Sequence, residues 1–110
     1  VSDAMATVGS AETSMTLFGE RIGVSEGALR TAAGTLAGAH LDLSMAARNA
    51  MAMIGASQED ALRMASLTPA EFLHIDRDRG RIAIGARADM VLFGPDLDVR
   101  NVWIAGNQVR

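Results

Sequence analysis

The chain has 110 residues, a formal net charge of −3 at pH 7 and an apolar content of 49%. A chain of this length and apolar content can bury one small core, which argues against disorder throughout. Acidic and basic residues are interspersed and no apolar run approaches the ~20 residues that cross a bilayer, so we expect no nucleic-acid partner, no membrane partner and, by default, a cytoplasmic location. The sequence has no cysteine, which excludes disulfides and thiolate metal ligands.

The first residues predict the end of a buried strand that runs into a loop. Residues 1–4 are apolar around one carboxylate, Asp3, and residues 5–14 lack both helical and alternating periodicity. Three short strands are expected next, in a small hairpin excursion, at residues 15–18, 21–24 and 28–31. The sequence opens at Val1 without an initiator methionine, and we therefore expect a fragment of a longer polypeptide.

Helical periodicity begins after residue 40. Residues 41–54 place apolar side chains around most of a helix, with only a narrow polar stripe, and Gly55 is expected to end this helix. Ser57 and Asp60 resemble a capping box, which predicts a second helix at residues 58–66.

A third, short helix is expected to end near His74. Thr68 is its predicted N-cap and Pro69 its first helical residue, with Glu71 reaching back to the cap. The apolar period then changes from 3.6 to 2, so we place a boundary near residues 76–80.

The last third of the chain predicts β structure. Ile82 and Ile84 alternate with other residues, and apolar runs follow at residues 90–93 and 99–105. Two turns are expected from their backbone chemistry, at residues 94–96 and at Gly106-Asn107. Neither the helical part nor the β part has enough partners to close a barrel or to bury both faces of a sheet.

Asp3 is the strongest candidate for chemistry, because a carboxylate between apolar strand residues is costly unless it is paired or functional. In a parallel αβ barrel it would stand at the C-terminal end of a strand, where catalytic side chains lie. An Asp that caps the following loop also fits these residues, and composition alone favours it. Gly34 and Gly38 allow a close approach of the backbone to a ligand, or form an ordinary loop.

The two histidines do not form a metal site by their spacing. His40 and His74 stand far apart in the sequence, whereas a catalytic zinc site needs three protein ligands. We expect no complete metal site within this chain and assign neither histidine a role. Trp103 is expected to anchor the packing of a sheet rather than a sugar ring.

Three stretches of the sequence resemble the amidohydrolase superfamily, whose members join a metal-bearing αβ barrel to a small β-sandwich domain. Residues 80–93 resemble a strand pair of the sandwich, and residues 61–70 resemble the helices that follow the last barrel strand. Residues 1–5, residues 34–38 and Ala47-Arg48-Asn49 together are similar to the N-acetylglucosamine-6-phosphate deacetylases.

The resemblance implies a fold and a reaction. The fold is α/β, with residues 1–76 as the C-terminal end of a metal-dependent (β/α)8 TIM barrel and residues 77–110 as strands of the β-sandwich. The reaction is hydrolysis of the acetamide of N-acetyl-D-glucosamine 6-phosphate to D-glucosamine 6-phosphate and acetate, in amino sugar catabolism. A divalent metal, zinc or iron, is implied, with ligands from an upstream barrel absent from this chain, as is a homodimer of the full-length protein. The chain alone would then be inactive.

The resemblance also implies roles for particular residues. Asp3 would end the eighth barrel strand and serve as the proton-transferring catalytic carboxylate. Leu36, Ala37 and Gly38 would lie against the bound sugar phosphate. Ala39 stands where the family often has serine.

Two other hypotheses remain open. Two of the three stretches are shared with dihydroorotase-like and nucleobase-deaminase-like amidohydrolases, although the loop at residues 34–38 argues against them. A non-catalytic interaction module is a hypothesis of a different class, with the apolar helix at residues 41–54 as its partner-binding face. It predicts a self-contained domain.

Overall fold

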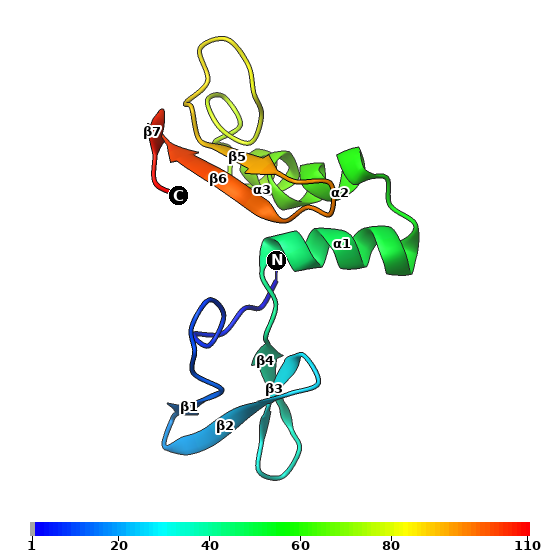
Figure 1. Ribbon diagram of the computed structural model, residues 1–110, viewed down its shortest axis with the longest axis vertical. Coiled ribbons are helices and arrows are strands. Elements are labelled where there is room, and N and C mark those ends of the chain that lie inside the picture. The colour runs from blue at the N-terminus through cyan, green and yellow to red at the C-terminus, as the bar shows by residue number, and fades with distance from the viewer. Residues whose placement is uncertain (1) are drawn as a thin grey trace. The chain divides into compact units, whose positions relative to one another are not determined.

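Figure 1 shows the computed structural model of the protein, which describes residues 2–110. Val1, the start of the predicted strand end, lies outside the described residues. The chain is α/β and forms two compact units, one that ends at Ala46 and one that comprises Ala47–Arg110, each with its own sheet. The boundary predicted near residues 76–80, between a TIM-barrel part and a β-sandwich part of a larger protein, stays a prediction.

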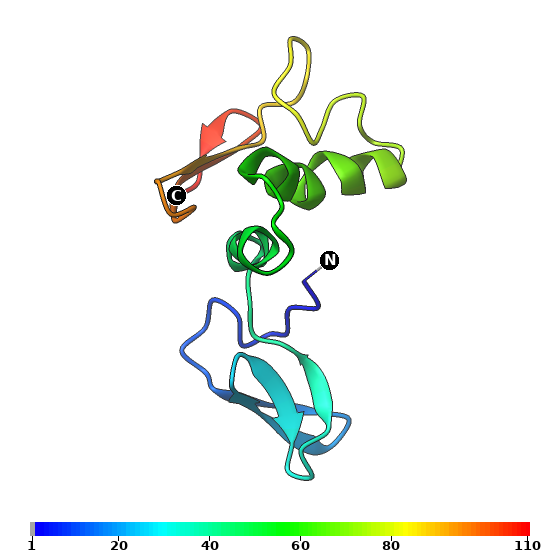
Figure 2. The ribbon, with the colours of Figure 1, turned by 90° about the vertical axis from the view of Figure 1, so that its right-hand side faces the viewer.

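The first unit is built on an antiparallel meander of four strands, which pair in chain order (Figure 2). The strands are β1 (Ser14–Leu17), β2 (Glu20–Ser25), β3 (Ala28–Thr31) and β4 (Leu36–Ala39). Two-residue turns with positive φ at both residues join the first three strands, a conformation that matches the twist of a hairpin. The three strands predicted here are confirmed: the bounds of the first two differ by one residue, and those of the third are the same.

β4 corrects the prediction of a loop at residues 34–38. Residues 32–35 form the turn, in which the amide of Gly34 donates to the Thr31 carbonyl at 2.9 Å, and pairing with β3 then begins at Leu36. The register between β3 and β4 shifts after Leu29, so a simple alternation pattern does not reveal this strand.

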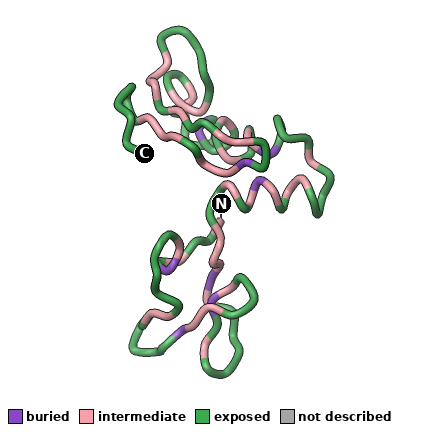
Figure 3. Tube along the Cα trace, viewed as in Figure 1, coloured by how far each residue is buried: buried purple, intermediate pink, exposed green. Residues whose placement is uncertain are grey.

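One face of this sheet carries the core of the first unit. Ile22 and Leu29 are 2% and 0% exposed, and the strand pairing puts both on the same face (Figure 3). Thr7, from the segment before β1, is the third fully buried side chain among the described residues. The amide of Val24 also donates to the Thr13 carbonyl at 2.8 Å, which ties the preceding segment to β2.

Three helices follow, as the sequence predicted. They are α1 (Leu43–Ile54), α2 (Gln58–Ala65) and α3 (Leu67–Phe72). Asp42 accepts a hydrogen bond from the Met45 amide at 2.7 Å and so caps the start of α1, two residues later than predicted. Ser57 accepts one from the Asp60 amide at 3.0 Å, which confirms the predicted cap of α2.

The predicted start of α3 is wrong by two residues. α3 begins at Leu67, and Ser66 stands at its N-cap position without a side-chain cap. The Ser66 hydroxyl donates instead to the Leu62 carbonyl of α2 at 2.7 Å. A single residue therefore links the two helices, and this leaves Thr68 inside α3 rather than at its N-cap.

The second unit ends in a three-stranded antiparallel sheet. Its strands are β5 (Met90–Phe93), β6 (Val99–Ile104) and β7 (Asn107–Gln108). Its last turn is Ala105-Gly106, both with positive φ, instead of the predicted Gly106-Asn107. The turn at residues 94–96 is confirmed by a 3.0 Å hydrogen bond from the Leu97 amide to the Gly94 carbonyl. Trp103 is half-buried in β6, between Met90 and Gln108 of the flanking strands.

The strand expected around Ile82 and Ile84 does not form. Both side chains are almost fully exposed, at 87% and 108%, and the segment is a loop with positive φ at Gly80 and Gly85. Alternation alone does not make a strand when no neighbouring strand takes up its backbone hydrogen bonds. Of the strand pair that residues 80–93 resemble, residues 90–93 form β5, whereas residues 80–89 are a loop that leads into it.

A small core holds the helices of the second unit to its sheet. Ala47 of α1, Ala61 of α2 and Leu97 of the β5–β6 turn form its centre. Arg48 fixes the same turn, because its guanidinium donates to the carbonyls of Asp96 at 3.3 Å and Leu97 at 3.4 Å. Within residues 2–110, no helix has both the length and the apolar content to cross a membrane.

Candidate functional site

Asp3 lies directly beside β4. Its carbonyl oxygen accepts a hydrogen bond from the Ala39 amide at 2.9 Å, and the Met5 amide donates to the Ala39 carbonyl at 3.1 Å. Ala4 and Ala39 thus form an isolated parallel bridge. The backbone of the candidate catalytic residue is in this way joined to the strand that contains the candidate substrate-binding residues 36–38.

The side chain of Asp3 is exposed and does not stabilise the described part of the chain through polar contacts. It makes no hydrogen bond or ion pair with any residue from 2 to 110. The backbone φ of Asp3 is 55°, a left-handed conformation that Asp tolerates better than most residues. The Ala4 amide donates to the Ser2 hydroxyl at 3.3 Å instead, so Asp3 does not cap the following loop.

The three candidate substrate-binding residues differ in exposure along β4. Leu36 is 62% exposed, Ala37 is half-buried and Gly38 is buried. Leu36 therefore has the largest exposed apolar surface of the three.

Gly38 is required by the segment that carries Asp3. Its φ is 151°, and a Cβ at this position would lie 2.8 Å from Sδ of Met5, closer still to Cγ of the same side chain, and 3.4 Å from the Asp3 carbonyl oxygen. The close approach predicted for this glycine is made by Met5, which lies across it. Any larger residue would force either the Met5 side chain or the Asp3 segment to move.

A side-chain hydrogen bond supports the same segment from its other end. Oγ1 of Thr7 and Nδ1 of His40 lie 2.9 Å apart, and Thr7 is 1% exposed. The His40 amide also donates to the Gly27 carbonyl of the β2–β3 turn at 3.0 Å. Neither residue carried a signal in the sequence, because a threonine in an aperiodic stretch and a lone histidine fit many roles. His74, by contrast, is exposed after α3, with φ of 57°.

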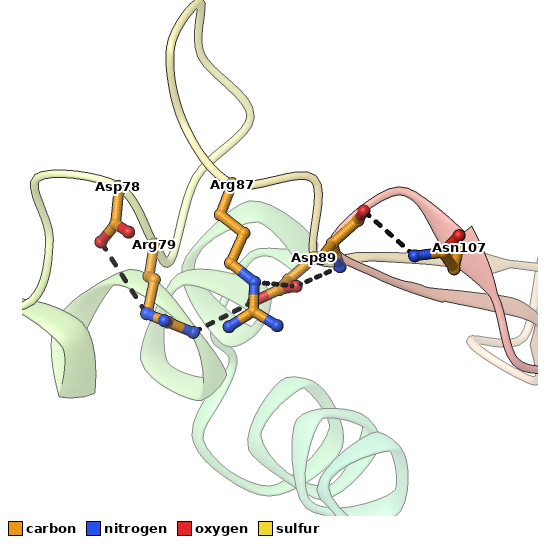
Figure 4. Close-up of polar contacts among 6 residues, drawn as sticks. Asp78, Arg79, Arg87, Asp89 and Asn107 are labelled. Atoms are coloured by element: carbon orange, nitrogen blue, oxygen red, sulfur yellow. Dashed lines mark hydrogen bonds and ion pairs between the residues drawn. The ribbon is translucent and has the colours of Figure 1, made fainter.

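A second cluster of charged side chains, in the second unit, stabilises the fold (Figure 4). Asp89 Oδ1 lies 3.1 Å from Arg87 Nε and accepts a hydrogen bond from the Ala105 amide at 2.8 Å, while Oδ2 lies 3.2 Å from Arg79 Nη1. Both oxygens of this carboxylate are engaged: Oδ1 joins Arg87 to the β6–β7 turn, and Oδ2 pairs with Arg79. Asp89 thus differs from Asp3, whose carboxylate has no such contacts.

The described residues do not supply a metal centre. Within residues 2–110, no three side chains of His, Asp or Glu lie close enough together to hold a metal ion. His40 is engaged with Thr7, and Asp3 stands alone. Among the described residues, the candidate site residues thus consist of one exposed carboxylate, Asp3, and one largely apolar strand, β4, beside it.

The family of the chain follows from comparison with known proteins. Residues 18–109 match the model of the amidohydrolase family. A putative N-acetylgalactosamine-6-phosphate deacetylase of Escherichia coli K12 is 38% identical over 96% of the chain, and an N-acetylgalactosamine-6-phosphate deacetylase of a Shewanella species is 41% identical over 96%. An N-acetylglucosamine-6-phosphate deacetylase of Vibrio furnissii is 32% identical over 99%. The chain spans 64% of the first relative and 27% of each of the other two.

Solved structures agree with the fold. The N-acetylglucosamine-6-phosphate deacetylase of Pasteurella multocida matches 98% of the chain with a TM-score of 0.92 and 29% identity, and that of Thermotoga maritima matches 98% with a TM-score of 0.84 and 35% identity. A D267A mutant of the Mycobacterium smegmatis enzyme, in complex with N-acetyl-D-glucosamine-6-phosphate, matches 99% with a TM-score of 0.81 and 33% identity. The chain spans 28% to 30% of these proteins.

Proposed function

Because the chain belongs to the amidohydrolase family, we propose that it is the C-terminal part of a deacetylase for N-acetyl-D-glucosamine 6-phosphate. The reaction is hydrolysis of the acetamide, which yields D-glucosamine 6-phosphate and acetate. The observation that carries this proposal is the exposed carboxylate of Asp3, which has no hydrogen-bond or ion-pair partner among residues 2–110 and whose backbone is joined to β4.

Asp3 acts in this proposal as general base and general acid. It accepts a proton from the water that attacks the acetamide carbonyl, and it returns the proton to the amine that leaves. A carboxylate with internal hydrogen bonds and ion pairs, such as Asp89, would have to break them to do this. The exposure of Asp3 therefore suits proton exchange with a bound molecule.

Leu36, Ala37 and Gly38 form the wall of the sugar phosphate site in this proposal. Leu36 contributes its exposed side chain, and Ala37 a smaller half-buried surface. Gly38 contributes backbone, and its lack of a side chain lets the Asp3 segment lie close to this wall. The wall and the proton-transferring group thus belong to one framework.

The rest of the centre comes from other parts of the protein in this proposal. A divalent metal, zinc or iron, supplies a more acidic bound water and a polarised carbonyl, and residues other than those described here hold it. Residues 1–76 belong to a TIM barrel and residues 77–110 to a β-sandwich, in a cytoplasmic homodimer. The many exposed apolar side chains of the second unit, with Phe72, Ile82 and Ile84 above 80%, support further polypeptide packing against it.

A second substrate, N-acetyl-D-galactosamine 6-phosphate, is favoured by one observation. The relatives named for this sugar are 38% and 41% identical to the chain, whereas the Vibrio furnissii relative named for the glucosamine compound is 32% identical. The two sugars differ only in the configuration at C4, so the same acetamide chemistry serves both.

Acetate release from the two sugar phosphates tests the proposal directly. The whole protein, loaded with zinc or with iron, is assayed with each substrate at equal concentration, and kcat/KM is compared. We expect turnover of the glucosamine compound. A kcat/KM more than tenfold higher for the galactosamine compound would make that compound the assigned substrate. If neither sugar phosphate releases acetate, the deacetylase assignment is wrong.

A further inference from the structure

Thr7 is the one buried polar residue among residues 2–110, and its hydroxyl is paired with an imidazole. Oγ1 lies 2.9 Å from Nδ1 of His40, whose residue number is 33 higher. Which of the two donates depends on the tautomer of His40. A buried hydrogen bond between distant segments fixes their relative position, because breaking it leaves an unsatisfied polar group inside the unit.

A hydroxyl beside an imidazole can also be a nucleophile and its base. Burial excludes that role here, since Thr7 is 1% exposed and a substrate carbonyl cannot reach its Oγ1. Among the described residues, no third group hydrogen-bonds the imidazole: the one other hydrogen bond of His40 runs from its backbone amide to the Gly27 carbonyl. The Thr7–His40 pair therefore has a role other than nucleophilic attack on a substrate.

The pair continues the ladder that holds Asp3. Two backbone hydrogen bonds join residues 3 and 5 to Ala39, at 2.9 and 3.1 Å. At residue 6 the chain enters a turn, in which the Val8 amide donates to the Met5 carbonyl, so backbone pairing with β4 stops. The Thr7 to His40 bond takes its place, two residues after Met5 on one segment and one residue after Ala39 on the other. His40 is itself anchored to the β2–β3 turn through Gly27.

From this arrangement we infer that Thr7 and His40 are positioning residues that hold the carboxylate of Asp3 in place for proton transfer. The inference rests on the proposed function. Without the pair, the Asp3 segment is held to β4 by the two hydrogen bonds to Ala39 and by the contact of Met5 with Gly38. A catalytic group displaced by about 1 Å can lose on the order of 100-fold in rate, so the pair should act mainly on kcat.

Two pairs of variants of the whole, metal-loaded protein test the inference. Thr7→Val removes the hydroxyl and keeps the shape, whereas Thr7→Ser keeps it. His40→Gln moves the polar group away from the Nδ1 position, whereas His40→Asn keeps an amide near it. We expect kcat to fall about 10- to 100-fold for Thr7→Val and His40→Gln, with KM changed less than threefold and the conservative partner within threefold of the unmodified protein.

Combination with Asp3→Asn separates positioning from general damage to the fold. If Thr7 acts through Asp3, then Thr7→Val has little further effect on the residual rate of the Asp3→Asn protein. The same fold-loss in both backgrounds, or an unchanged kcat in Thr7→Val, overturns the positioning role while leaving the deacetylase assignment intact. If Thr7→Val does not fold, His40→Gln provides the same test. Because His40 is only half-buried, its substitution disturbs the packing less. No turnover by the unmodified protein overturns the proposed function and this inference with it.

Discussion

The carbonyl oxygen of Asp3 accepts a hydrogen bond from the amide of Ala39 at 2.9 Å. This single contact joins two parts of the sequence that carry the proposed chemistry, a carboxylate near the start of the chain and an apolar strand 33 to 36 residues later. Because the link is made by backbone atoms, it does not occupy the carboxylate. Asp3 is thus fixed in place and still free to exchange a proton.

Asp3→Asn should abolish most of the deacetylase activity that we propose for the whole protein. The substitution keeps the shape and the backbone link to Ala39 but removes the basic oxygen, and general acid–base groups contribute roughly 10²- to 10⁴-fold to rates. We expect kcat to fall by about that factor, with bound metal and melting temperature unchanged. Acetate release and metal analysis measure this. Glu20→Gln, an exposed carboxylate of β2 in the same unit, is the control and should keep full activity; equal activity in both variants contradicts the role of Asp3.

Gly38→Ala should destabilise the first unit and lower activity. The new Cβ would overlap the side chain of Met5, and a φ of 151° is strained for any residue with a side chain. We expect a loss of about 1–3 kcal/mol in the free energy of unfolding, measured in urea. Gly23→Ala is the matched control, because its φ is ordinary and the nearest atom to its Cβ, the Thr13 carbonyl oxygen, is 3.9 Å away. A loss no greater than that of Gly23→Ala would show that Met5 moves aside freely.

Leu36→Ala should weaken substrate binding without damaging the fold. Leu36 is 62% exposed, so its truncation leaves no internal cavity, but the proposed sugar phosphate would lose an apolar contact. We expect KM to rise about tenfold, with kcat within threefold, because removing a few methyl groups from a binding surface costs about 1–3 kcal/mol. Phe18→Ala, fully exposed in the β1–β2 turn, is the control and should leave KM unchanged. An unchanged KM in Leu36→Ala removes this residue from the site.

The strands of the first unit could be predicted because their signals are local. Gly19 and Gly27 mark two-residue turns, and the strands beside them pair with their neighbours in the chain. β4 gave no such signal: it contains Gly38, and the residue that makes this glycine necessary is Met5, far away in the sequence. The family resemblance implied roles for Asp3 and for residues 36–38, but the sequence predicted no contact between Asp3 and this strand.

Two other differences between the sequence predictions and the structure also arise from contacts between distant segments. Ile82 and Ile84 alternate like strand residues, but a strand also needs a neighbour, and none lies beside them within the described chain. Thr7 and His40 have no pattern in the sequence at all, since their pairing depends on where the turn at residues 6–9 leaves the chain. Local patterns reveal turns and caps, whereas contacts between distant segments require the folded structure.

Ser57→Ala and Thr68→Ala should separate a true helix cap from an apparent one. Ser57 accepts a hydrogen bond from the Asp60 amide, so its loss should cost about 1 kcal/mol of unfolding free energy. Thr68 lies inside α3, and its replacement should change stability by less than about 0.5 kcal/mol. Urea unfolding of both variants measures the difference. A larger loss for Thr68→Ala would mean that α3 begins at Pro69, as the capping pattern predicted.

Asp89→Ala should destabilise the second unit without changing deacetylase chemistry. The Asp89 carboxylate binds the amide of Ala105, a residue held at φ of 50° in the β6–β7 turn, and pairs with Arg79 and Arg87. All three side chains are about one-third exposed, so solvent weakens the ion pairs, and we expect a loss of about 1–2 kcal/mol. Urea unfolding measures it, and kcat per folded molecule should stay the same.

Salt separates the two kinds of contact that Asp89 makes. At 1 M NaCl the ion pairs with the arginines are screened, whereas the hydrogen bond to the Ala105 amide is not. Part of the loss in Asp89→Ala should therefore persist at high salt. Asp98→Ala is the control, because Asp98 pairs with Arg100 at 2.6 Å where both side chains are about half exposed, and its small effect should vanish with salt. A complete loss of the Asp89 effect at 1 M NaCl would mean that the turn at Ala105-Gly106 forms without the carboxylate, so that the ion pairs alone stabilise the loop.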